Sequence, residues 1–111
     1  MSDTGIEPRV NGKYLPNYIS RVVRAIAKVV RLNGDRAIVQ LSDGAQVEVI
    51  LSPDSHISDP YVELVARVNS KDELRMYTGI NLGDNVDMDA VNHTIELMHT
   101  PVMAPYWHTT L

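Results

Sequence analysis

The stretch RVVRAIAKVVRLNGDRAIVQLSDGAQVEVIL, residues 21–51, decides the fold of this chain. Polar and apolar side chains alternate with a period of two, as in β-strands, in three runs: residues 21–32, 36–41 and 45–51. The tripeptides Asn-Gly-Asp at 33–35 and Ser-Asp-Gly at 42–44 separate these runs, and both are turn signals. The stretch therefore predicts three consecutive strands joined by tight turns.

Two further alternating runs follow, over residues 61–69 and 74–80. Residues 52–60 are a polar loop with a proline near each end, and residues 70–73 are a turn. Five short antiparallel strands within about 60 residues must protect their edges, which favours a small closed barrel. We therefore predict an all-β fold, a five-stranded OB-fold barrel, with an SH3-like barrel as the alternative.

A short helical turn is expected before the barrel. Tyr14 and Tyr18 are four residues apart, as are Leu15 and Ile19, which places each pair on one helical face. So short a helix is not stable alone and should pack on one end of the barrel. The polar residues 1–9 before it are expected to be a flexible leader.

The segment after the last strand predicts an α-helix that begins at Asp87 and ends before Pro101. On a helical wheel, its apolar side chains fill about half of the circumference, which is wider than the stripe that one core requires. Four apolar residues also follow the 3-4-3 spacing of a helix-bundle seam: Met88, Val91, Ile95 and Met98. The other half of the wheel is polar: Asp89, Asn92, His93, Glu96 and His99.

This helix has two interpretations. It covers only its own barrel, or one side contacts the barrel while the other packs on partner helices. We favour the second interpretation, because such a face left exposed would be a large apolar patch for a monomer. The predicted partner-helix interface comprises Met88, Val91, Thr94, Ile95, Leu97 and Met98. The segment after Pro101, with Tyr106 and Trp107, adds further apolar surface.

With 111 residues, the chain has the size of one domain. We divide it into a leader (1–9), the OB barrel (10–82), a loop with the assembly helix (83–101) and a tail (102–111). The chain contains no cysteine, which excludes disulfides and cysteine metal sites and favours a reducing compartment. No apolar run is long enough to span a membrane, and no signal peptide is recognisable at the N-terminus.

No catalytic or metal site can be assembled from the sequence. None of the four histidines has the HxxxH spacing that places two ligands on one helical face: His56, His93, His99 and His108. Ser52, Asp54 and His56 share one loop of turn-forming residues, which is a poor setting for a nucleophilic triad. We therefore expect no enzyme activity, no cofactor, no metal and no small-molecule substrate.

Nucleic-acid binding is the second functional hypothesis, since OB barrels bind single strands across strands 2–3 and adjacent loops. The formal net charge of −4 and the lack of aromatic residues in 36–51 argue against strong autonomous binding. Arg31 is a cation that is also expected on an outward face of its strand, in addition to the candidate contact residues named next. Those candidates are Arg24, Lys28, Arg36, Lys71, Arg75 and, as a stacking residue, Tyr77.

The chain resembles a known family, the smallest subunit of replication protein A, from about residue 9 to residue 101. No single motif is diagnostic, and the resemblance rests on an ordered series along the chain. The series comprises Arg9-Val-Asn11, Leu15, Ile19, the 23–29 strand, Leu41-Ser-Asp-Gly44, Val65-Ala-Arg-Val68, Asn92, Ile95, Leu97-Met-His99 and Pro101.

This resemblance implies an OB-fold, a nuclear location and roles in DNA replication, repair and recombination. It also implies a heterotrimer in which the C-terminal helix joins one helix from each of two larger OB-fold subunits in a three-helix bundle. Single-stranded DNA would then be bound mainly through those partners. An autonomous single-strand-binding domain and the smallest member of a telomere-capping complex remain as alternatives.

Overall fold

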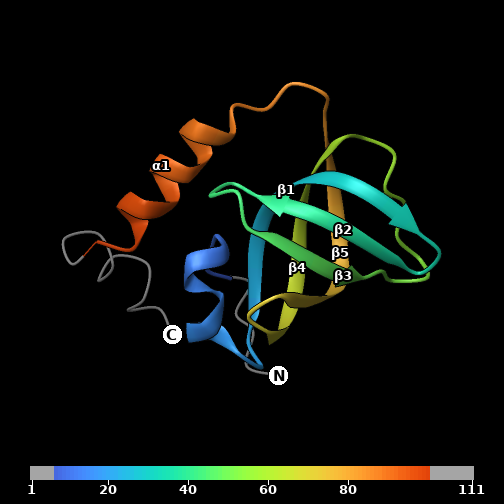
Figure 1. Ribbon diagram of the computed structural model, residues 1–111, viewed down its shortest axis with the longest axis horizontal. Coiled ribbons are helices and arrows are strands. Elements are labelled where there is room, and N and C mark those ends of the chain that lie inside the picture. The colour runs from blue at the N-terminus through green and yellow to red at the C-terminus, as the bar shows by residue number, and fades with distance from the viewer. Residues whose placement is uncertain (1–6, 101–111) are drawn as a thin grey trace.

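The computed structural model describes residues 7–100, which form one barrel with a helix beside it (Figure 1). The predicted tail and residues 1–6 of the predicted leader lie outside the described residues. In chain order the elements are η1 (Gly12–Tyr18), β1 (Val22–Asn33), β2 (Arg36–Leu41), β3 (Gln46–Ile50), β4 (Tyr61–Ser70), β5 (Glu73–Gly83) and α1 (Met88–Met98).

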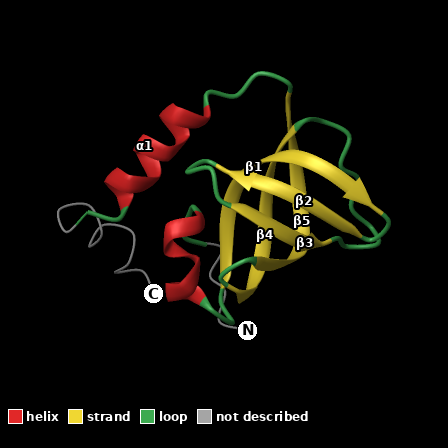
Figure 2. Ribbon diagram, viewed as in Figure 1, coloured by secondary structure: helices red, strands yellow, loops and turns green. Residues whose placement is uncertain are grey.

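The five strands close into a barrel in the order β1-β2-β3-β5-β4 (Figure 2). The long strand β1 makes closure possible, because its first half pairs with β4 and its second half with β2. A register shift between Val29 and Arg31 bends β1 where it passes from one neighbour to the other. This arrangement is that of an OB-fold-like barrel.

Two parts of the fold prediction need correction. The strands β3 and β5 pair in parallel, whereas five antiparallel strands were expected. The barrel closes only because β3 pairs with β5. The alternation of side chains within each strand does not indicate which strands pair, so the sequence did not predict this pairing. The term all-β is also too broad, since the chain is mostly β but carries the 3₁₀ helix η1 and the C-terminal helix α1.

The strand β5 is longer than the sequence predicted, because it continues beyond Ile80 to Gly83. Asn81 and Gly83 are residue types that favour turns, yet they pair with Val62 and Tyr61 at the start of β4. The Asn81 side chain also ties the preceding loop to β5, since its Oδ1 accepts from the Ser58 and Asp59 amides. Gly83 adopts a φ of 89°, where a glycine is favoured, and this ends the strand.

Aliphatic side chains fill the barrel, as the alternation predicted. Full burial of one leucine, such as Leu64, contributes about 1.5–3 kcal/mol to folding. From η1, Leu15 and Tyr18 close one end of this core. The barrel core consists of Val23, Ala25, Ala27, Ala37, Val39, Leu41, Val47, Val49, Val62, Leu64, Ala66, Val68, Leu74 and Met76.

The part of the predicted leader that the structure describes lies against the barrel. The amide of Arg24 donates to the Pro8 carbonyl, and the Val10 amide donates to the Arg24 carbonyl, each at 2.9 Å. Arg9 forms an ion pair with Glu63 of β4 at 2.9 Å. Residues 7–9 therefore lie along the start of β1, and the flexible leader expected over residues 1–9 stays a prediction.

Candidate functional site

The helix α1 lies beside η1 at one side of the barrel (Figure 1). As predicted, Asp87 caps its N-terminus, because the Asp87 carboxylate accepts a hydrogen bond from the Ala90 amide at 3.1 Å. Asp89 lies in the first turn, where a negative charge is favourable. The helix therefore begins where the sequence indicated, and its orientation is set by contacts farther along.

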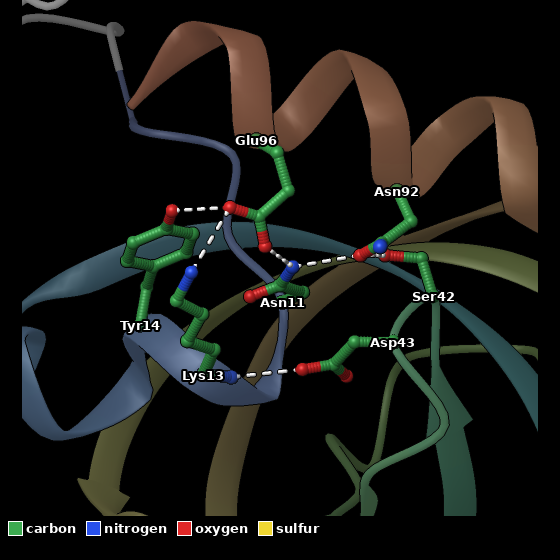
Figure 3. Close-up of polar contacts among 7 residues, drawn as sticks. All are labelled: Asn11, Lys13, Tyr14, Ser42, Asp43, Asn92 and Glu96. Atoms are coloured by element: carbon green, nitrogen blue, oxygen red, sulfur yellow. Dashed lines mark hydrogen bonds and ion pairs between the residues drawn. The ribbon is translucent and has the colours of Figure 1, made fainter. Parts of the chain in front are cut away.

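The polar side of α1 makes the side-chain hydrogen bonds that join the helix to residues 11–14 and to Ser42 (Figure 3). The Asn11 amide group donates to Asn92 Oδ1 at 2.7 Å and to Glu96 Oε2 at 3.2 Å. The Tyr14 hydroxyl donates to Glu96 Oε1 at 2.6 Å, and the Ser42 hydroxyl donates to Asn92 Oδ1 at 3.3 Å. We call these five residues the latch: Asn11, Tyr14, Ser42, Asn92 and Glu96.

The latch rests on a second set of contacts that fixes η1 to the β2–β3 turn. The carboxylate of Asp43 accepts hydrogen bonds from the backbone amides of Gly12, Lys13 and Ala45 at 2.9–3.2 Å. The Lys13 ammonium reaches Glu96 Oε1 at 3.2 Å. Asp43 thus holds the N-terminal segment where its side chains can meet α1.

Hydrogen bonding shifts the pKa values within the latch. The pKa of Glu96 is lowered, chiefly because its carboxylate accepts the Tyr14 hydroxyl hydrogen bond and also those of Asn11 and Lys13, against partial desolvation. The same bond raises the pKa of Tyr14, since the bond needs the protonated hydroxyl. The bond to Glu96 likewise raises the pKa of Lys13. Glu96 is therefore held as a carboxylate at neutral pH.

His99 extends the contact at the C-terminal end of α1. Its ring stacks on Tyr14 with 4.0 Å between ring centroids and 13° between planes. Its Nε2 lies 2.9 Å from the Arg9 carbonyl oxygen. The helical wheel placed Asn92, Glu96 and His99 together on the polar half of the helix. The structure gives these three side chains partners in residues 9–14 and in Ser42.

The apolar side of α1 is only partly covered by the rest of the described chain. Of the predicted interface residues, Thr94 and Leu97 are exposed, Leu97 to 48%. Ile95 needs correction, because it is only 2% exposed and is therefore buried against its own chain. The remaining predicted interface residues are half-buried: Met88, Val91 and Met98.

A groove of about 310 Å³ runs along the junction of α1 and the barrel. Ala90, Val91 and Thr94 line it from the helix, and Ile26 lines it from β1. The outward surface of α1 is therefore continuous with an apolar position on the barrel wall.

The predicted nucleic-acid residues fall into two groups. Arg24 and Arg36 are occupied by carboxylates: Arg24 contacts Glu7 at 3.1 Å, and Arg36 contacts Glu48 at 3.3 Å. The other candidates are exposed, and the cations among them form no ion pair with any residue in the 7–100 range. These are Lys28 on β1, Lys71 in the β4–β5 turn, and Arg75 and Tyr77 on β5.

The described residues contain no group of three or more His, Cys, Asp or Glu side chains placed to hold a metal. In the same part of the chain, no helix has the length and apolar character needed to cross a membrane. His56 lies in the loop before β4, and His93 is exposed on α1. His108 lies outside the described residues.

Sequence reasoning did not find the latch, although one signal was present. Asn92 and Glu96 are four residues apart and share a helical face with His99, so three polar side chains point the same way. Their partners come from residues 11–14 and from Ser42, more than 45 positions earlier in the chain. Only the three-dimensional fold brings these segments together.

Comparison with known proteins identifies the family. A family model described as replication factor A protein 3 matches residues 1–104. The chain belongs to this family. It is also 30% identical over 88 residues to a 14 kDa subunit of replication protein A from Arabidopsis thaliana, covering 79% of this chain and 82% of that protein. The resemblance to the smallest replication protein A subunit is thereby confirmed.

Solved structures share the fold of this replication factor A protein 3 family member. A chain in the structure of U. maydis replication protein A bound to ssDNA superposes with a TM-score of 0.82 at 24% identity, covering 90% of this chain and 93% of that one. The S. pombe Stn1–Ten1 complex contains a chain with a TM-score of 0.67 at 10% identity, with coverage of 87% and 93%. The S. pombe telomere capping protein Ten1 superposes with a TM-score of 0.63 at 12% identity, covering 82% of this chain and 95% of that one.

Proposed function

We propose that this chain is a non-catalytic structural subunit that assembles and stabilises a heterotrimeric single-stranded DNA-binding complex. The complex would act in the nucleus in DNA replication, repair and recombination. Its other members would be two larger OB-fold subunits, and single-stranded DNA would be bound mainly through them. Membership of the replication factor A protein 3 family and the partly exposed apolar face of α1 support this proposal.

The orientation of α1 is the observation that carries the proposal. A surface helix ordinarily turns its apolar stripe to its own core and its polar side to water. Here Asn92 and Glu96 bind the η1 segment and the β2–β3 turn, while Thr94 and Leu97 are exposed. An outward apolar stripe raises the free energy of the free subunit, so it fits a helix that is covered by partners. One helix from each larger subunit would complete a three-helix bundle.

Replacing the outward residues tests the proposal. The double variant Val91→Glu/Leu97→Glu should lose co-purification with the two larger subunits, because two carboxylates cannot be buried in an apolar bundle. Its barrel should stay folded, since Leu97 is exposed and Val91 is half-buried. The isolated double variant should therefore unfold within a few degrees of the wild-type melting temperature.

His93→Glu is the matched control, because His93 is exposed on the same helix and lies outside the predicted interface. It introduces a carboxylate without changing the apolar stripe and should co-purify normally. Normal assembly of the Val91→Glu/Leu97→Glu variant would refute the proposed interface.

The fold likeness to Ten1 keeps a telomere-capping complex as the second candidate. The family match favours the replication complex, because it rests on sequence over residues 1–104, whereas the Ten1 likeness is one of fold. Offering the full chain the larger subunits of both complexes in equal amounts separates the two. We expect recovery with the replication subunits, and selective recovery with the telomere subunits would reverse the assignment.

A further inference from the structure

Two arginines face each other across the strands β4 and β5. Arg67 and Arg75 are directly paired residues in the register of these antiparallel strands, and both are exposed. Like charges in opposite positions repel each other and destabilise a sheet. Their next neighbours around the barrel, Val22 on β1 and Ile50 on β3, are uncharged. Neither of these two cross-strand neighbours therefore offsets the repulsion.

No carboxylate of residues 7–100 forms an ion pair with Arg67 or Arg75. Arg36, by contrast, lies between Glu48 at 3.3 Å and Glu73 at 3.5 Å, and Arg24 lies between Glu7 and Glu63. The chain therefore neutralises two arginines of the β1–β2 wall and leaves the facing pair on β4–β5 open. An open guanidinium pair is suited to bind an anion such as a phosphodiester.

An exposed aromatic ring lies next to this pair. The β4–β5 register shifts so that Ala66 pairs with Met76 and Val65 with Thr78, which leaves Tyr77 as the extra residue of a bulge. Tyr77 is 47% exposed and lies two positions from Arg75. β5 pairs with β3 only as far as Arg75, so β3 does not lie alongside Tyr77.

We propose that Arg67, Arg75 and Tyr77 form a contact site for single-stranded nucleic acid. The two guanidinium groups bind phosphodiester oxygens, and the Tyr77 ring stacks on a neighbouring base. The site lies on the β4–β5 wall and is separate from the α1 surface, so it does not depend on the assembly role. It also differs from the strand 2–3 face that OB barrels commonly use. Of the cations expected from the sequence, only Arg75 belongs to this site, and Arg67 is added to it. Lys28 and Arg31 lie on β1, outside the site.

The test is a salt titration of the full chain with a fluorescently labelled oligothymidylate. Each phosphate contact to a single strand contributes about 0.7 to the slope of log affinity against log salt, so Arg67→Gln/Arg75→Gln should reduce the slope by about 1.4. Tyr77→Leu should leave the slope unchanged and weaken binding at least about fivefold, the low end of one stacking contact. The control Lys28→Gln/Arg31→Gln removes the same charge from β1 and should reduce the slope less.

Several outcomes would overturn the proposal. These are an unchanged slope in Arg67→Gln/Arg75→Gln, an equal loss in the Lys28→Gln/Arg31→Gln control, or equal competition by a polyglutamate peptide. An abasic oligonucleotide that binds as tightly as oligothymidylate would overturn the stacking role of Tyr77. Thermal unfolding guards against misfolding: because the arginine pair repels itself, the Arg67→Gln/Arg75→Gln variant should melt no lower than the wild type at low salt.

Discussion

At the residue scale, Glu96 is the centre of the latch, because its two carboxylate oxygens receive hydrogen bonds from three different side chains. Oε1 accepts from Tyr14 and Lys13, and Oε2 accepts from Asn11. Asn11 is completely buried, and its amide group finds its acceptors on α1, at Asn92 Oδ1 and Glu96 Oε2. The latch is therefore sensitive to the charge of Glu96.

Replacing Glu96 with Gln should weaken the latch by about 1 kcal/mol, since a charge-assisted hydrogen bond at a partly exposed group becomes a neutral one. It should also change the pH dependence of stability. The pKa of Glu96 is lowered by folding, so its contribution is complete above the ordinary value of 4.5 and is lost as the pH falls through the folded value. Melting temperatures between pH 7 and pH 3 should therefore fall more for the wild type than for Glu96→Gln.

At alkaline pH the sign is reversed. Folding raises the pKa of Tyr14, so the contribution of its hydrogen bond to stability is present below 10.0 and is lost as the pH rises through the folded value.

The control for the acid prediction is Glu48→Gln. This variant removes a carboxylate that pairs with Arg36 on the barrel wall and leaves the latch intact. If Glu96→Gln and the wild type lose stability in parallel on acidification, Glu96 does not hold the helix through its charge.

Single residues were predictable where their role is local. The cap at Asp87 follows from its position directly before an apolar periodic segment, and the structure confirms it. The latch was not predictable, because Asn11 and Glu96 are 85 positions apart and neither residue reveals its partner. The burial of Ile95 was missed for the same reason, since a wheel shows which residues share a face and not what the face meets.

At the scale of elements, η1 acts as the spacer between the barrel and α1. It is fixed to the β2–β3 turn through Asp43, and it presents Tyr14 to the helix. Gly12 makes this close approach possible, because a Cβ at this position would overlap the Ala45 Cβ and crowd the Asp43 carboxylate. The position of α1 therefore depends on a residue without a side chain in a different element.

Gly12→Ala should push η1 away from the β2–β3 turn and destabilise the chain by about 1–3 kcal/mol, as overpacking usually does. Gly79→Ala is an informative control. A Cβ at Gly79 meets the terminal methyl group of the flexible Met76 side chain, which can move aside. Denaturant unfolding should therefore give Gly12→Ala a clearly lower free energy of unfolding than Gly79→Ala. The reverse order would show that η1 does not require the close approach.

The elements themselves were largely readable from the sequence. Alternation located all five strands because each has one face in the barrel core, and the N-cap and proline bounded the C-terminal helix. The pairing of β3 with β5 and the end of β5 at Gly83 were not readable. Both depend on pairing with residues that lie well outside the local sequence window, and such pairing overrides local turn-forming residues.

At the scale of the whole molecule, the barrel and α1 are stabilised in different ways. The barrel has a continuous aliphatic core closed by strand pairing on all sides, whereas α1 is attached through the latch, the His99 stack and one buried residue, Ile95. An isolated helix of 11 residues is marginal in water, so α1 depends on those contacts or on partners for its structure. Loss of α1 should therefore leave the barrel intact.

Deleting residues 87–111 tests this division directly. The truncated chain should retain a cooperative unfolding transition and the β-sheet signal in circular dichroism, because every core residue of the barrel precedes residue 87. Its melting temperature should fall modestly, since Asn11 and Tyr14 lose their partners on α1 and become hydrated instead. Mass determination after co-expression with the two larger subunits that we propose as partners should find the truncated chain absent from the complex. A truncated chain that is unfolded would show that α1 is part of the barrel's own stability, and one that still assembles would move the docking surface from the helix to the barrel wall.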